Sequence, residues 1–284
     1  MRLLGKRPAY HLAHLVTFWY VLFYPSIRRR CRFYLQRRFP NHQGPLRRFL
    51  DTFRLVRTYG SSLVDGMVLD IFGPGAFNAT CPDGERLLQL STGDRGLVLI
   101  LAHVGCWRVG MSTLDHLPKR VWVVRIPEPP APGQSEARNA GAIDPRFGLD
   151  SVLQMTDALL RGDIVAISGD RTLGSEQSVI SAQFLGKQAL LPIVPYRLAS
   201  ATGSPVVIMT APRIARDRYE LRLAKVFEVP PGLGRIPQNY APYAQLFADA
   251  LEQFVHEHPW QFYNFYDFWQ YPTGKTEPAI ATSN

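Results

Sequence analysis

Blocks of apolar residues alternate along the chain with blocks of helical spacing. The run 97–102 (LVLILA) is wholly apolar and follows a turn-like Gly-Asp-Arg-Gly, which is typical of a buried parallel strand. Further strands are predicted over residues 120–126, 163–168, 205–210 and 219–227. Apolar residues at helical spacing predict helices over residues 45–72 (one helix or two), 104–117, 150–161 and 240–256.

This alternation predicts an α/β fold whose mixed, mostly parallel sheet is flanked by helices. The length of 284 residues suits one such domain with a short appendage, and 46% hydrophobic residues can build its core. A charged share of 19% is too low for a disordered protein. Residues 127–148 contain four prolines between Pro127 and Pro132, and we expect a long loop there that acts as a lid.

The N-terminal region carries the excess positive charge of the chain. Residues 1–58 contain 13 lysines and arginines and one acid, a balance of +12, whereas the rest contains 19 and 22, a balance of −3. Within this region, residues 10–24 (YHLAHLVTFWYVLFY) combine apolar and aromatic side chains and are followed by the basic run 28–32. The apolar run of about 14 residues is shorter than the ~20 that a spanning helix needs.

A signal peptide is disfavoured, because no small-x-small cleavage site is present and RRRCR follows the apolar run. Aromatic residues next to arginines are typical of a membrane interface. We therefore expect residues 1–40 to form an amphipathic, interfacial helical segment, and residues 41–284 to form the α/β domain. A helix buried in the globular core is the alternative.

Other classes of protein are disfavoured by what the sequence lacks. The cysteines at positions 31, 81 and 106 are too far apart for a zinc site or a disulfide framework, so we expect no metal and a reducing compartment. No recognition-helix or RRM-like pattern accompanies the arginines, so nucleic acid is not an expected partner. The absence of P-loop, GxGxxG, GxSxG and HExxH motifs disfavours nucleotide, dinucleotide and serine-hydrolase chemistry.

Two predicted strands end in residues that can carry chemistry. His103 directly follows the 97–102 strand, where ligands meet an open α/β sheet, and an imidazole is the natural base for a hydroxyl. Asp170 and Arg171 follow the 163–168 strand. His103 could instead be a structural or incidental histidine. Asp170 and Arg171 could instead form an ion pair that braces the sheet. Cys106 could act as a nucleophile beside His103, or could be a small buried residue.

Three segments resemble the lysophospholipid acyltransferase superfamily, in its branch of lipid A biosynthesis (lauroyl/myristoyl) acyltransferases. LVLILAHVGCWRVGMSTL is similar to the first block, in which a histidine ends a strand and an acid follows five positions later, the H-x4-D/E motif. GDIVAISGDR and the residues up to PVVIM resemble the next blocks, and PWQFYNFYDFW is similar to the carboxyl-terminal signature. The resemblance implies a glycerolipid acyltransferase-like fold over nearly the whole chain.

The resemblance also implies a chemistry and roles for individual residues. A fatty acyl group would pass from acyl carrier protein or acyl-CoA, as co-substrate and without a further cofactor, to a hydroxyl or amine of a lipid-like acceptor. His103 matches the general base, and Gly105 matches the glycine of the tight turn after it. Arg171 and Arg197 are candidates for contacting phosphate or the acyl oxyanion. The enzyme would be peripheral or monotopic, at the membrane lipid surface of the cytoplasmic face of the bacterial inner membrane.

Arg108 departs from the motif, because it occupies the position of the usual acid. An acid there orients the histidine and stabilises its imidazolium, and an arginine would do the opposite. Three outcomes are open. Asp170 could replace the missing acid, or His103 could act unaided while Arg108 binds a phosphate. In the third, the protein is a catalytically silent lipid- or acyl-carrier-binding protein of the same fold.

Overall fold

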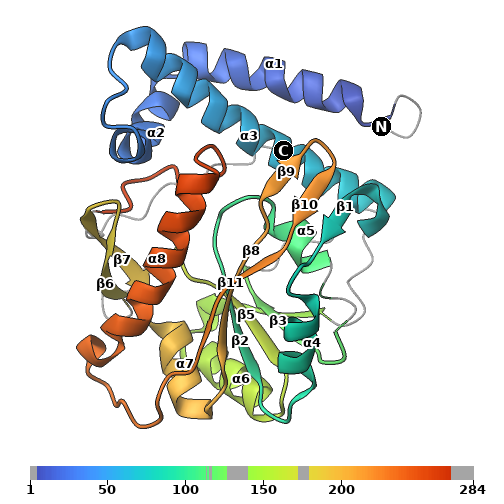
Figure 1. Ribbon diagram of the computed structural model, residues 1–284, viewed down its shortest axis with the longest axis vertical. Coiled ribbons are helices and arrows are strands. Elements are labelled where there is room, and N and C mark those ends of the chain that lie inside the picture. The colour runs from blue at the N-terminus through green and yellow to red at the C-terminus, as the bar shows by residue number, and fades with distance from the viewer. Residues whose placement is uncertain (1–4, 113, 115–116, 127–139, 172–178, 270–284) are drawn as a thin grey trace.

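A six-stranded sheet forms the centre of the protein (Figure 1). The computed structural model describes residues 5–112, 114, 117–126, 140–171 and 179–269. The strand order is β11-β8-β2-β5-β3-β4. Their bounds are β2 (Leu97–Leu101), β3 (Val121–Val124), β4 (Ala140–Ile143), β5 (Ile164–Ser168), β8 (Val206–Thr210) and β11 (Arg222–Phe227). β11 pairs antiparallel to β8, and the other neighbouring pairs are parallel. The prediction of a mixed, mostly parallel α/β sheet is confirmed.

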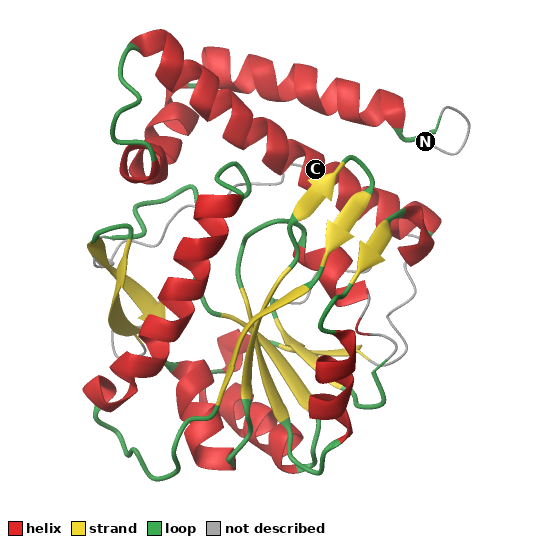
Figure 2. Cartoon of the chain, viewed as in Figure 1, coloured by secondary structure: helices red, strands yellow, loops and turns green. Residues whose placement is uncertain are grey.

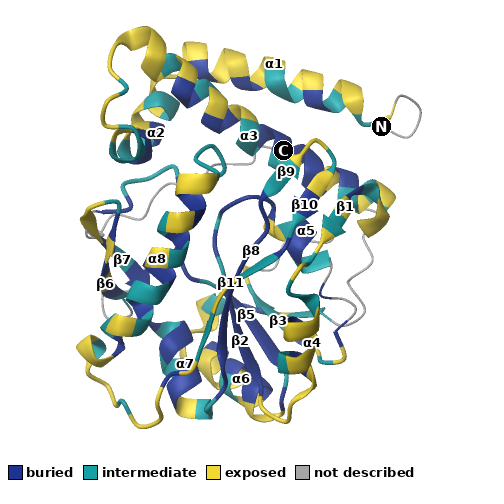
Figure 3. Ribbon diagram, viewed as in Figure 1, coloured by how far each residue is buried: buried dark blue, intermediate teal, exposed yellow. Residues whose placement is uncertain are grey.

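Helices and loops cover both faces of this sheet (Figure 2). Val98 and Ile100 of β2 join the cluster that includes Phe247, while Leu97 and Leu99 join a second cluster on the other face with Leu87. Both faces of β2 are therefore buried, which explains its wholly apolar sequence (Figure 3). The helices are α4 (Gly84–Thr92), α5 (Trp107–Ser112), α6 (Leu149–Leu160), α7 (Val194–Thr202) and α8 (Ala241–Glu257).

Three N-terminal helices lie across one end of the molecule, at the top of Figure 1. They are α1 (Arg7–Phe23), α2 (Pro25–Arg38) and α3 (Pro45–Phe72). α3 is one continuous helix of 28 residues. Gly60 lies within it where α1 crosses closely, since a Cβ on Gly60 would come within 2.8 Å of the Thr17 side chain.

The helix α1 presents two different faces. Tyr10, Thr17 and Val21 are buried, whereas a row of large apolar side chains is exposed. That row includes Leu12, Leu15, Val16, Trp19, Leu22 and Phe23. Within the described ranges, no helix is both long enough and apolar enough to cross a membrane.

Several predicted elements have different bounds in the structure. The helix expected over residues 104–117 begins later than predicted, at Trp107, because a turn at Gly105 precedes it; its described part is Trp107–Ser112. Residues 219–227 form two strands in different sheets, β10 (Arg218–Glu220) and β11. Of the expected loop 127–148, residues 140–143 form β4 beside β3, and residues 127–139 lie outside the described residues.

Short elements complete the fold and were not predicted. β1 (Asn78–Thr80) and β9 (Arg213–Ala215) flank β10 in a three-stranded sheet, and β6 (Val179–Phe184) pairs with β7 (Lys187–Pro192) as a hairpin. The 3-10 turns are η1 (Pro74–Ala76), η3 (Pro145–Phe147) and η5 (Pro237–Tyr240).

Candidate active site

The sheet brings His103 and Asp170 together. β2 and β5 are parallel neighbours, and their register pairs Leu101 with Ser168. His103 lies two residues beyond Leu101, and Asp170 lies two residues beyond Ser168. Both side chains therefore leave the sheet at the same edge, at the carboxyl ends of the strands, where open α/β sheets bind their ligands.

His103 and Asp170 form a hydrogen-bonded pair. The His103 ring atom Nδ1 is 2.9 Å from Asp170 Oδ1, and the His103 backbone N–H donates to Oδ2 at 2.8 Å. Because a carboxylate only accepts, Nδ1 carries the proton, and Nε2 is the basic nitrogen of the neutral ring. The His103 side chain is 31% exposed and the Asp170 side chain 0%. This arrangement, with a partly exposed imidazole on a buried carboxylate, can take a proton from a bound substrate.

Several hydrogen-bond donors surround the Asp170 carboxylate and keep it ionised. Besides the two bonds from His103, it accepts from the Ser168 hydroxyl at 2.7 Å and from the Asn264 amide at 2.8 Å. Burial by itself raises the pKa of Asp170. The charge of His103 and the hydrogen bonds from His103 and Ser168 outweigh burial, and hold that pKa well below its usual range. The pair therefore contains a carboxylate at neutral pH.

A glycine permits the turn that carries His103. Gly105 has a φ of +59°. A Cβ at this position would lie 2.1 Å from the carbonyl oxygen of Ala211, which accepts the Cys106 N–H at 3.1 Å. Only glycine combines this φ with so close an approach of another backbone segment. The expectation of a tight turn at Gly105 is met by this geometry.

A carboxyl-terminal segment, residues 258–269, packs on the same turn. The Tyr263 N–H donates to the His103 carbonyl at 2.8 Å, and Phe262 forms an antiparallel bridge with Val104. Asn264, which is buried, reaches Asp170 from this segment. Sequence reasoning used this stretch only as a family signature and missed Asn264. An asparagine between aromatic residues carries no periodic signal that would identify it.

The three candidate arginines lie in different places. Arg171 is exposed next to the His103–Asp170 pair, and its side chain donates to Asn264 Oδ1 at 3.4 Å and to the Tyr263 carbonyl at 3.5 Å. No bond between the side chains of Arg171 and Asp170 is found among the described residues, so Asp170 does not brace Arg171. Arg197, on α7, donates to the Arg235 carbonyl at 3.0 Å. Figure 1 places α7 at the opposite end of the sheet from α3 and α5.

The Arg108 side chain contacts α3. Its guanidinium pairs with both carboxylate oxygens of Asp70. Its stem packs where Gly66 leaves room, since a Cβ on Gly66 would lie 2.8 Å from a guanidinium nitrogen of Arg108. Arg108 therefore joins α5 to α3 through an ion pair, and the structure does not bring it together with the other candidate residues.

Cys106 is a buried thiol and not a partner of His103. Its sulfur approaches the Ser62 carbonyl of α3 at 4.0 Å, and the residue is 2% exposed. Burial raises the pKa of the Cys106 thiol, which opposes formation of a nucleophilic thiolate. The possibility of a Cys106–His103 nucleophile is therefore contradicted by the packing.

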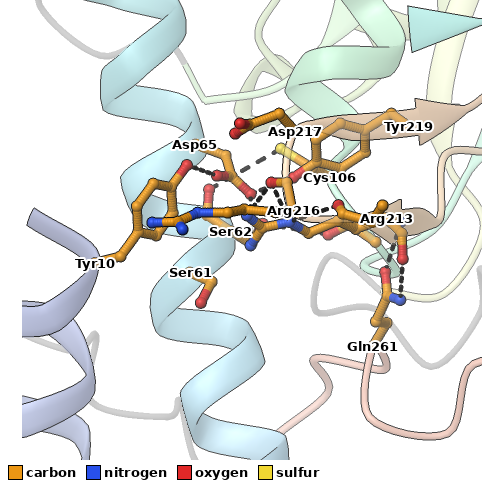
Figure 4. A network of polar contacts seen from close by, with 12 residues as sticks. Tyr10, Ser61, Ser62, Asp65, Cys106, Arg213, Arg216, Asp217, Tyr219 and Gln261 are labelled. Carbon is orange, nitrogen blue, oxygen red and sulfur yellow. Dashed lines mark hydrogen bonds and ion pairs between the residues drawn. The ribbon is translucent and has the colours of Figure 1, made fainter. Parts of the chain in front are cut away.

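A second polar cluster lies near Cys106, between α3 and the small sheet (Figure 4). The Asp65 carboxylate accepts the hydroxyls of Tyr10 and Tyr219, and Arg213 Nη1 lies 3.5 Å from it. Burial raises the pKa of Asp65, and the Arg213 charge opposes this. These residues come from α1, α3, β9 and β10, so the cluster ties the N-terminal helices to the small sheet. Sequence reasoning did not identify it.

A cavity of about 170 Å³ lies beside this cluster. Ser62, Asp65, Gly105, Arg213 and Tyr263 are among its lining residues. The cavity has both polar and apolar lining atoms, and it adjoins the turn from the side of α3.

Known proteins resemble the chain in sequence and in structure. The family of bacterial lipid A biosynthesis acyltransferases matches residues 2–270. None of the curated proteins matches the chain significantly. Among solved structures, the crystal structure of the 1-acyl-sn-glycerophosphate (LPA) acyltransferase PlsC from Thermotoga maritima is similar at 12% sequence identity and a TM-score of 0.41, covering 88% of this chain and 98% of that chain. The family match spans nearly the whole chain, and the resemblance inferred from the motifs is confirmed. The chain belongs to the bacterial lipid A biosynthesis acyltransferase family, and the protein is an acyltransferase.

Proposed function

We propose that this acyltransferase uses His103 as a general base to move a fatty acyl group from a thioester onto a lipid-like acceptor. The donor is acyl carrier protein or acyl-CoA, and the acceptor presents a hydroxyl or an amine. The observation that carries this proposal is the His103–Asp170 pair, with Nδ1 on a buried carboxylate and the ring partly exposed.

The proposed reaction needs no covalent enzyme intermediate. Nε2 of His103 takes the proton of the acceptor hydroxyl, and the hydroxyl oxygen attacks the thioester carbonyl carbon. The tetrahedral intermediate then collapses, the carbon–sulfur bond breaks, and the imidazolium returns the proton to the leaving thiolate. The products are the acyl ester and the free thiol. Asp170 keeps Nδ1 protonated and stabilises the imidazolium while it exists.

The position of Asp170 supports activity despite Arg108. The silent alternative arose because Arg108 occupies the place of the motif acid. In the structure a carboxylate reaches Nδ1 from the neighbouring strand, and the charge of Arg108 is paired with Asp70. Both observations favour an active enzyme over a protein that only binds lipid.

Arg171 is the arginine whose position best suits a substrate contact. It is exposed beside Asn264, which touches the Asp170 carboxylate. We propose that Arg171 contacts the acyl oxyanion or a phosphate of the substrate. Gly105 belongs to the same proposal, because it permits the tight turn of the backbone two residues after His103.

Membrane association is proposed from the N-terminal helices. The exposed apolar row on α1 includes Trp19 and Phe23, whose rings stack 4.8 Å apart. Arginines of α2 at positions 28–30 and 32 follow this row, and would be attracted to anionic lipid or to an acidic carrier protein. We propose that residues 1–40 form the membrane-interface segment and that residues 41–284 form the acyltransferase domain. The protein would be a peripheral or monotopic membrane protein at the cytoplasmic face of the bacterial inner membrane.

The reaction is tested with purified protein and defined donors. Dodecanoyl and hexadecanoyl chains are supplied on CoA and on acyl carrier protein, with a detergent-dispersed extract of bacterial membrane lipids as acceptor. We expect thiol release together with a lipid that gains the mass of the acyl chain. We expect His103→Ala to abolish both. Full turnover by His103→Ala contradicts the role of the base.

Membrane binding is tested by vesicle sedimentation. Trp19→Glu combined with Phe23→Glu should release the protein from phosphatidylethanolamine vesicles that contain phosphatidylglycerol, because two charged side chains replace the inserted rings. Leu149→Glu with Leu153→Glu on the exposed side of α6 is the matched control and should not change binding. Added salt should weaken binding without abolishing it. Equal binding by the α1 variant and the unmodified protein contradicts this assignment.

A further inference from the structure

We propose that Asn264 is a positioning residue of the active site, whose side-chain amide holds the Asp170 carboxylate against His103. This inference rests on the proposed role of His103 as the base. It concerns the carboxyl-terminal segment, to which no catalytic role has been given above.

The contacts of Asn264 determine which way its amide lies. Nδ2 donates to Asp170 Oδ2 at 2.8 Å, and Oδ1 accepts from Arg171 Nε at 3.4 Å. A flipped amide would place an oxygen against the carboxylate and an NH2 group against the guanidinium. Asn264 is 2% exposed, so water cannot readily replace it as the donor to Oδ2.

The two carboxylate oxygens of Asp170 accept hydrogen bonds from different donors. Oδ2 accepts the His103 backbone N–H and the Asn264 amide. These two bonds orient the plane of the carboxylate, and the orientation leaves Oδ1 for His103 Nδ1 and the Ser168 hydroxyl. Without Asn264, Oδ2 loses one of its two anchors, and the carboxylate can rotate away from Nδ1.

Residues on both sides of Asn264 bind the backbone of the same pair. The Tyr263 N–H donates to the His103 carbonyl at 2.8 Å, and the Tyr266 hydroxyl donates to the Asp170 carbonyl at 2.8 Å. The segment thus contacts the main chain of both residues, and Asn264 supplies its contact with the carboxylate. The backbone contacts fix Asn264 where its amide reaches Oδ2.

Kinetics separate positioning from substrate binding. With dodecanoyl-CoA and the lipid extract, Asn264→Ala should lower kcat about 10- to 100-fold, the range of one hydrogen bond to a charged group. KM should stay within about twofold, because the amide acts through Asp170, and Arg171 keeps its bond to the Tyr263 carbonyl when it loses the long one to Asn264. Asn239→Ala is the matched control, since Asn239 donates to the Leu233 carbonyl on the exposed surface, and it should retain full activity.

The pH profile separates positioning from a loss of folding. Asn264→Asp places a second carboxyl group on Oδ2, with the Arg171 guanidinium on its other side and His103 on the far side of Asp170. Two contacting carboxylates raise the pKa of one of them, and the charges of Arg171 and protonated His103 oppose part of that rise. Once that group is protonated it can donate to Oδ2 again. The deficit of Asn264→Asp relative to the unmodified protein should therefore shrink as the pH falls, whereas the deficit of Asn264→Ala should not.

A spectroscopic readout does not depend on turnover. Spectra of protein with 15N-labelled histidine report which ring nitrogen carries the proton, and His103→Gln assigns the His103 signals. We expect the Nδ1–H form in the unmodified protein and in Asn239→Ala, and a mixture of the two tautomers in Asn264→Ala. An unchanged tautomer in a folded Asn264→Ala variant overturns the proposal, as does a kcat within about threefold of normal. Activity in His103→Gln refutes the base instead, and the tautomer measurement still decides the role of Asn264.

Discussion

Replacing Asp170 with asparagine should damage both catalysis and stability, by amounts that follow from its donors. Each carboxylate oxygen accepts two hydrogen bonds: Oδ1 from His103 Nδ1 and Ser168, and Oδ2 from the His103 backbone and Asn264. An asparagine keeps one oxygen and turns an NH2 group toward the donors on the other side. Two donors, each at least partly buried, then lose their acceptor, at about 1–3 kcal/mol each, so the free energy of unfolding should fall by about 2–6 kcal/mol.

Asp170→Asn should also lower kcat, for reasons separate from its effect on stability. An asparagine amide can hold the imidazole in the wrong tautomer and cannot stabilise the imidazolium by charge. In serine proteases the corresponding change lowers kcat on the order of 10⁴-fold. We expect Asp170→Asn to lower kcat roughly 10³- to 10⁴-fold in the thiol-release assay, measured on protein shown to be folded by circular dichroism.

Stability should depend on pH in a defined direction. The pKa of Asp170 is lower in the folded protein than in the unfolded chain, because the charge and hydrogen bonds of His103 outweigh burial. Its contribution is therefore fully present above the unfolded pKa of about 3.9 and is lost as the pH falls toward the folded pKa. An asparagine does not titrate. The difference in free energy of unfolding between the unmodified protein and Asp170→Asn should be largest near neutral pH and shrink below about pH 4.

The matched control lies at the other end of the same strand. Asp163 accepts the Trp122 indole N–H at 3.0 Å and is partly exposed. Asp163→Asn should therefore retain full kcat and lose less than about 1 kcal/mol. Urea unfolding followed by tryptophan fluorescence measures both variants. The reasoning is refuted if Asp170→Asn keeps more than about a tenth of the normal kcat, or if its stability deficit is the same at neutral and acid pH.

Three further predictions concern the packing around the site. Gly105→Ala should lower the free energy of unfolding by about 3–5 kcal/mol in urea titration, because its Cβ would meet the neighbouring backbone at a φ of +59°; a loss below about 1 kcal/mol contradicts this. Arg108→Ala removes a partly exposed ion pair with Asp70, so kcat and KM should stay within about twofold and stability within about 1 kcal/mol; a raised KM would instead give Arg108 a substrate contact. Tyr219→Phe removes a buried donor to Asp65 and should cost about 1–3 kcal/mol by calorimetry; an unchanged thermal midpoint would show that this bond is not needed.

The local sequence pattern was enough to predict the strands of a mostly parallel sheet and to place His103 at the carboxyl end of one of them. The wholly apolar run 97–102 predicts a strand covered on both faces, and the structure buries Val98 and Leu99 on opposite faces of β2. His103 follows directly, and the glycine at position 105 marks the turn. Such features are readable because side-chain periodicity and backbone freedom are set by neighbouring residues alone.

Local pattern was misleading where segments meet distant partners. Residues 219–227 read as one strand, yet β10 pairs with β1 and β9 while β11 pairs with β8. Residues 140–143 lie in what reads as a loop, and they pair with β3. In both places the choice of hydrogen-bonding partner decides the structure, and that partner lies elsewhere in the chain.

The composition of the active site was decided by tertiary structure. Asp170 is 67 residues from His103, and Asn264 is 94 residues from Asp170. The β2–β5 register brings the first two together, and the carboxyl-terminal segment adds the third by packing on their loops. The sequence by itself determined which residues could do the chemistry, because residue type and strand position are local. Only the fold decided that Asp170 accepts the hydrogen bond of His103 Nδ1 and that Arg108 pairs with Asp70, because contact between distant residues depends on how the strands and helices pack.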